Sequence, residues 1–101
     1  MQEMVKIHKA LASKKRLQIL DWLKESVSNF PPQIDGDLES DGVCGLLIAQ
    51  KLKVSQPTTS RHLKMLVDVG LVEATKIGQW TFYKRNKARI AEVRKLINTT
   101  I

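Results

Sequence analysis

A group of mostly polar and basic side chains within residues 55–72 has a spacing that places it on one side of a helix. The group comprises Gln56, Pro57, Thr58, Ser60, Arg61 and Lys64. At about 100° per residue, Leu63 and Leu66 fall on the opposite, apolar side. Guanidinium, ammonium, amide and hydroxyl groups bond base edges and phosphates when a helix enters the major groove of DNA. The stretch therefore predicts a helix that reads a DNA sequence.

Local signals mark the ends of this helix and predict a second helix before it. Ser55 is a good N-cap because its hydroxyl can accept a hydrogen bond from an unpaired backbone N–H, and Gly70 is a natural C-cap. Residues 44–52 predict a short helix that ends in a tight turn at Lys53, where a left-handed conformation would cost about 1 kcal/mol. The arrangement over about 44–69 is a helix-turn-helix. An ordinary helical hairpin needs the same apolar residues but does not need the polar group.

Residues 71–85 predict a β-hairpin directly after the reading helix. Two segments rich in β-branched and aromatic residues flank Gly78 and Gln79, and a two-residue loop with glycine first suits a type II′ turn. A hairpin at this place is the wing of a winged helix-turn-helix domain. Lys76, Gln79 and Lys84 would then lie where the DNA backbone or minor groove passes, although such residues also simply keep an exposed hairpin soluble.

We assign the ring side chains near this predicted DNA surface to packing. Trp80, Phe82 and Tyr83 could stack on bases, but the chain has few aromatic residues, which favours their use in the core. His62 falls on the shoulder of the buried helix face, where packing or capping is favoured over contact with a base.

Apolar residues at helical spacing also predict two helices before the helix-turn-helix and one after the hairpin. They cover about 4–11, 13–26 and 87–101. We expect the core to leave apolar stripes on the first and last of these uncovered, and a homodimer would bury them. The stripe residues are Met4, Ile7, Leu11, Ile90, Val93, Leu96 and Ile97.

The segment 27–43 predicts a loop because Pro31 and Pro32 exclude a helix and turn-forming residues follow. Its alternating acids do not make a calcium-binding loop. The glycine at the sixth position is missing, and the twelfth position, counted from Asp35, is Leu46 and not a bidentate carboxylate.

Composition predicts one domain over residues 1–101, with 43% hydrophobic residues and a net charge of +7. Residues 1–41 have 6 basic and 7 acidic side chains, whereas residues 42–101 have 11 basic and 3 acidic side chains. The positive charge therefore accompanies the reading helix and favours a polyanionic partner. One cysteine excludes an internal disulfide, and no apolar run has membrane-spanning length, so we expect a soluble, cytoplasmic protein.

These features together resemble the ArsR (ArsR/SmtB) family of bacterial winged-helix transcriptional repressors. The most specific part is LLIAQKLKVSQPTTSRHLKMLVDVGLV, supported by ALASKKRLQILDWL and by the wing pattern G-x-W-x-x-Y from Gly78 to Tyr83. The resemblance implies that the terminal helices form the dimer interface. It implies DNA contact at Gln56, Ser60 and Arg61, with Pro57 and Thr58 beside them.

Cys44 matches only part of the family's metal-sensing motif, C-x-C-D, because Leu46 and Leu47 stand at the second cysteine and the aspartate. Zinc or arsenic needs three or four donors, and one thiolate does not supply them. The family's other site, on the last helix, is also incomplete because that helix has Glu92 and no histidine. We expect no cofactor and a plain, partly buried Cys44; a metal site with His8 or a redox-sensing thiol are the alternatives.

The chain is thus predicted to be a mainly α-helical winged helix-turn-helix protein with four helices, two strands and a last helix. We expect it to bind double-stranded DNA as a dimeric repressor, at an imperfect inverted repeat with half-sites about 34 Å apart. The alternatives are a protein-interaction module and a sensor that responds to a thiol reagent or a metal through Cys44. An enzyme is not expected, since paired carboxylates, an activated nucleophile and a phosphate-binding glycine loop are all missing from the sequence.

Overall fold

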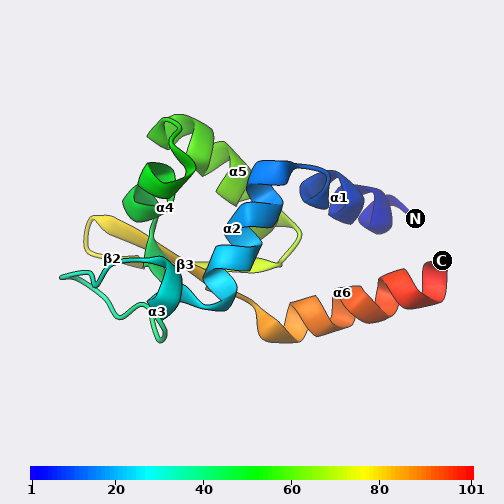
Figure 1. Ribbon diagram of the computed structural model, residues 1–101. Helices are drawn as coiled ribbons and strands as arrows, with labels where there is room; N and C mark the ends of the chain where they lie inside the picture. The colour runs from blue at the N-terminus through cyan, green and yellow to red at the C-terminus, as the bar shows by residue number, and fades with distance from the viewer.

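Six helices and a small antiparallel sheet make up the computed structural model, which describes all residues from 1 to 101 (Figure 1). The elements, in chain order, are α1 (Gln2–Leu11), α2 (Lys14–Lys24), α3 (Ser26–Asn29), β1 (Val43–Cys44), α4 (Gly45–Leu52), α5 (Gln56–Asp68), β2 (Val72–Ile77), β3 (Trp80–Arg85) and α6 (Lys87–Thr100). The strand order is β1-β3-β2. None of the helices has both the length and the hydropathy that crossing a membrane requires.

Two short elements differ from the predicted order. The single turn α3 begins the segment predicted to be a loop, and Asn29 holds it by donating from Nδ2 to the carbonyl of Trp22 at 3.2 Å. Cys44 belongs to β1, opposite Phe82, so α4 begins at Gly45 and not at Cys44. Two residues are too few for a periodic pattern, and their pairing partner lies far along the chain, so sequence periodicity does not reveal this strand.

The β2–β3 hairpin confirms the predicted wing. Ile77 is paired with Trp80, which leaves Gly78 and Gln79 as a two-residue turn. Gly78 has φ +61°, whereas Gln79 is not among the residues with positive φ. A positive φ at the first turn position alone defines type II′, whose twist matches that of the flanking strands.

One hydrophobic core lies between the helices and the inner part of the sheet. The turn between α4 and α5 brings their apolar faces together, and α5 also packs against α2 and β2. The most deeply buried apolar side chains are Ile7, Ile19, Val43, Ile48, Leu63, Leu66, Val72 and Phe82. Truncating such a leucine to alanine typically costs about 2–5 kcal/mol, so this core fixes the position of α5.

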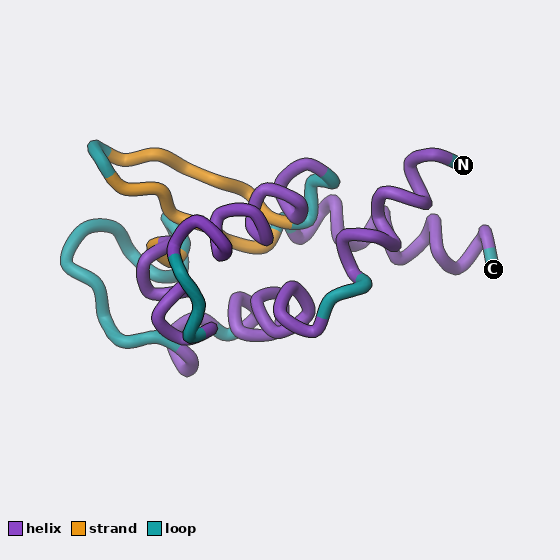
Figure 2. The backbone as a smooth tube through the Cα atoms, turned by 90° about the horizontal axis from the view of Figure 1, so that it is seen from above, coloured by secondary structure: helices purple, strands orange, loops and turns teal.

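The terminal helices α1 and α6 extend together from one end of the molecule, and both termini lie there (Figures 1 and 2). The chain's own core covers more of their apolar stripes than the sequence suggested. Buried within the single chain are Met4, Ile7, Ile90 and Val93. Partly buried are Leu11, Leu96 and Ile97. We expected the core to leave both stripes uncovered. That expectation is wrong for the four buried residues and holds in part for the three partly buried ones.

Candidate nucleic-acid interface

The reading helix α5 begins with the predicted cap. Ser55 accepts a hydrogen bond at Oγ from the backbone N–H of Thr58 at 3.2 Å, and its hydroxyl donates to Thr58 Oγ1 at 3.0 Å. Pro57 lies in the first turn, where its missing N–H removes no helical bond. The capped turn fixes the direction in which the first side chains of α5 leave the backbone.

The two faces of α5 divide as predicted. On the inner face, Thr59, Leu63 and Leu66 are buried, and the Thr59 hydroxyl donates to the Ser55 carbonyl at 3.0 Å. The outer face carries the predicted DNA-contacting group, of which only Thr58 is partly buried. Its exposed members are Gln56, Pro57, Ser60, Arg61 and Lys64.

Local bonds constrain part of the outer face. Arg61 donates from Nη2 to Thr58 Oγ1 at 3.3 Å, so the Thr58 hydroxyl serves both the cap and the guanidinium. Lys64 forms an ion pair with Asp68 at 3.1 Å. Both partners of this pair are exposed, so it contributes less than about 1 kcal/mol and leaves the ammonium accessible.

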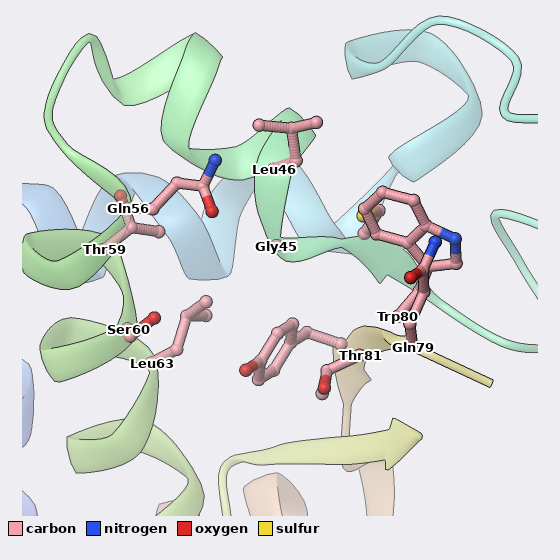
Figure 3. Close-up of a pocket in the computed structure, with 11 residues that line it drawn as sticks. Gly45, Leu46, Gln56, Thr59, Ser60, Leu63, Gln79, Trp80 and Thr81 are labelled. Carbon is pink, nitrogen blue, oxygen red and sulfur yellow. The ribbon is translucent and has the colours of Figure 1, made fainter. Parts of the chain in front are cut away.

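A cleft of about 220 Å³ separates the start of α5 from the end of the wing (Figure 3). The amide of Gln56 and the hydroxyl of Ser60 point into it from α5, and Gln79 and Thr81 lie on the opposite side, on the wing. The structure thus brings together three residues that the sequence singled out from separate elements. Thr81 is an addition, since its place beside Gln79 follows only from how the hairpin packs against α5.

Trp80 is the aromatic residue for which the predicted core position is wrong. Its side chain is 36% exposed and lines the cleft, whereas Phe82 is 1% exposed and Tyr83 is partly buried, as predicted. The difference arises because Trp80 is the first residue after the turn, where the hairpin has passed the edge of the core. The place of Trp80 directly after the predicted turn was the only sequence signal for this exposure.

The two wing lysines considered from the sequence have different surroundings. Lys76 is exposed on β2. Lys84 instead donates from Nζ to the carbonyl of Ser40 at 3.0 Å and lies 4.0 Å from a carboxylate oxygen of Glu73. Lys84 therefore anchors the acidic loop, residues 35–42, to the sheet, and we omit Lys84 from the candidate interface.

His62 takes the packing role predicted for it. Its Nδ1 lies 2.9 Å from Nη1 of Arg16, a buried residue of α2. Burial, followed by the positive charges of Arg16, Lys15 and Arg61, lowers the pKa of His62 below its ordinary value of 6.5. The imidazole is therefore neutral near pH 7.

The surroundings of Cys44 do not fit a metal-sensing site. Cys44 is partly buried at the end of β1, directly before α4, whereas His8 is on α1, which α2 separates from α4 (Figure 1). No three side chains of His, Cys, Asp or Glu lie close enough together to hold a metal ion. A single thiolate does not supply the donor set that zinc or arsenic requires.

A helix-turn-helix braced by further helices, with a β-hairpin beside the exposed face of its second helix, defines a winged helix-turn-helix protein. Residues 44–74 match the family model described as bacterial regulatory protein, arsR family. The chain belongs to the ArsR family of transcriptional regulators, as its relatives confirm.

Two relatives and one solved structure are similar over nearly the whole chain. The uncharacterized HTH-type transcriptional regulator YbzH of Bacillus subtilis (strain 168) is 40% identical over 98% of this chain and 99% of its own. The arsenical resistance operon repressor of Staphylococcus aureus is 32% identical over 96% of this chain and 79% of its own. The solved structure is the homodimeric winged helix-turn-helix DNA-binding domain of a possible ArsR-family transcriptional regulator from Mycobacterium bovis. It is 26% identical, with a TM-score of 0.66, and the match covers 98% of this chain and 78% of its own.

Proposed function

We propose that this regulator represses transcription by binding an operator in double-stranded DNA as a homodimer. The observation that carries the proposal is the outer face of α5, where a capped helix presents exposed polar and basic side chains beside the wing. The names of two similar proteins, a repressor and a homodimeric DNA-binding domain, support the same function.

Each exposed group has a role that its chemistry favours. Arg61 is our candidate for bidentate bonding to guanine, and Gln56 for contact with adenine or a phosphate. Ser60 and the partly buried Thr58 suit phosphates or base edges. Lys64 suits a phosphate, with Pro57 packed beside these groups at the helix start. On the wing, Lys76 and Gln79 would contact the backbone or minor groove.

The dimer is proposed to form through α1 and α6. Leu11, Leu96 and Ile97 are only partly buried by their own chain, and Val5 is 47% exposed. A two-fold axis through this end would place two reading helices in successive major grooves about 34 Å apart, which requires an inverted repeat. Sedimentation equilibrium should give twice the chain mass at micromolar concentration, and a stable monomer there would contradict the dimer.

Selection of genomic DNA fragments on the purified protein tests the function. We expect enrichment of an imperfect inverted repeat, and an affinity for it that falls steeply and log-linearly with salt concentration. Failure to enrich any sequence, together with salt-insensitive binding to another protein, would favour the protein-interaction module instead.

Repeating the selection with zinc and with an oxidant tests the role of Cys44. We expect unchanged enrichment in both cases, and loss of enrichment with the oxidant alone would make Cys44 a redox-sensing thiol.

Location and mode of action follow from the same proposal. The proposed operator-binding regulator would meet its DNA in the cytoplasm, and a lone free cysteine suits that reducing compartment. The proposed action is binding alone, with no catalytic step assigned to any residue.

A further inference from the structure

One arginine joins the end of α1 to the reading helix. Arg16 lies on α2 and is only 9% exposed. Its guanidinium donates from Nε to the carbonyl of Ala10 at 2.6 Å, and from Nη2 to the carbonyl of Lys9 at 2.9 Å. The remaining nitrogen, Nη1, lies 2.9 Å from Nδ1 of His62 on α5. The same planar group therefore caps α1 and contacts the helix that is proposed to enter DNA.

The third contact requires a particular form of the imidazole. A guanidinium has donors and no acceptor, so Nδ1 of His62 must accept the bond from Arg16. The ring proton then lies on Nε2, and the ring is neutral. A second proton would place an N–H and a positive charge directly against the guanidinium, and the contact would be lost.

The charges around His62 all oppose its protonation. Arg16 and Lys15 act on the ring from α2, and Arg61 acts from α5 itself. None of the charged groups acting on the ring is a carboxylate that could stabilise an imidazolium. From α1 the contact involves only the two main-chain carbonyls that Arg16 binds.

We propose that Arg16 is a positioning residue for operator binding, which acts by holding neutral His62 and so fixes α5 relative to α1. His62 directly follows Arg61, the candidate guanine contact, so a displacement here moves the guanidinium that must meet a base edge within hydrogen-bonding distance. Because α1 lies at the proposed dimer end, the contact also fixes the reading helix relative to the two-fold axis. This inference rests on the proposed DNA-binding function.

Operator affinity at about pH 8 and about pH 5.5 tests the inference, because histidine is the side chain that ordinarily titrates in this range. In His62→Asn the amide oxygen can stand in place of Nδ1 without titrating. His8→Asn is the matched control, because it makes the same substitution at the chain's other histidine, which is exposed on α1. Fluorescence anisotropy should show weaker binding at the lower pH for wild type and His8→Asn, and no pH dependence for His62→Asn.

A second variant separates positioning from stability. His62→Leu fills the space but accepts no hydrogen bond, so we expect about tenfold weaker binding at both pH values while the protein stays folded by circular dichroism. A lower melting temperature with unchanged operator affinity would show that the contact serves stability only, and would overturn the inference.

The imidazole itself can be observed without DNA. Nitrogen-15 NMR of the free protein should show the Nε2–H tautomer of His62 at neutral pH; an Nδ1–H tautomer would overturn the inference. The same NMR titration shows the pH at which His62 takes up its second proton. Wild-type affinity that is equal on the two sides of that pH, or higher on the acid side, would overturn the inference while the proposed function stands. If the wild type selects no operator at about pH 8, the proposed function fails and this inference fails with it.

Discussion

Gly36 lies against the ring of Phe82 so closely that a Cβ atom on residue 36 would be 2.8 Å from the ring's Cε1 atom. Gly36 also has φ +82°, a conformation that strains any residue with a side chain. Phe82 is 1% exposed, so its ring can make room for a new methyl group only by moving its packed neighbours as well. The acidic loop is thereby seated on β3, although its composition predicts only a solvated loop.

Gly36→Ala should therefore destabilise the fold by about 1–3 kcal/mol, because left-handed strain and overpacking add. Gly78→Ala is the matched control, since Gly78 has φ +61° but nothing within 4 Å of an added Cβ. The control should lose about 1 kcal/mol from backbone strain alone. Urea unfolding measures both, and equal losses would show that the Phe82 contact is unimportant.

Lys53→Gly should stabilise the protein by about 0.5–1 kcal/mol. Lys53 ends α4 with φ 60° and ψ 40° and is the chain's one non-glycine residue with positive φ. Glycine adopts this conformation without the Cβ clash, and the gain exceeds its larger entropy in the unfolded chain. Lys53→Ala keeps the Cβ and should leave the urea midpoint nearly unchanged. A lower midpoint for Lys53→Gly would refute the strain argument.

Ser55→Ala should cost about 1 kcal/mol, because it removes the acceptor for the Thr58 N–H. Ser60→Ala, an exposed substitution on the same helix, should change the free energy of unfolding by less than about 0.5 kcal/mol while weakening operator binding. Chemical unfolding and operator titration of both variants separate the two roles. A full-stability Ser55→Ala protein would contradict the cap.

Arg61→Ala should cost about 1–3 kcal/mol of operator binding and relax the preference at one base pair. Lys64→Ala should weaken binding to all sequences alike and lower the salt slope by about 1. Anisotropy titrations against the selected operator and its single-base variants measure both effects. Equal operator affinity of wild type and Arg61→Ala would refute the assignment of Arg61.

Stability should fall on acidification because of His62. Burial and neighbouring cations lower the folded-state pKa of His62 below 6.5, so the folded state binds fewer protons than the unfolded chain. Its stabilising contribution is complete above about pH 6.5 and is lost as the pH falls through the folded-state pKa. The free energy of unfolding should decrease more in wild type than in His62→Asn between about pH 7.5 and pH 5. Parallel pH profiles would contradict this prediction.

The sequence by itself determined the elements whose signals are local. The cap at Ser55, the two faces of α5 and the turn at Gly78 follow from hydrogen-bonding chemistry and from the helical and strand periods, which involve residues close together in the chain. Those signals were enough to predict the winged helix-turn-helix and the outer face of its reading helix.

Only the tertiary structure decided what depends on residues distant in the chain. The pairing of Cys44 with Phe82, the exposure of Trp80 and the bond between Arg16 and His62 all join separate elements. An apolar stripe likewise indicates that one side of a helix is buried. It does not indicate whether the core of the same chain or a partner chain buries it. Periodicity reports which side of an element is apolar; what packs there is set by how the whole chain folds.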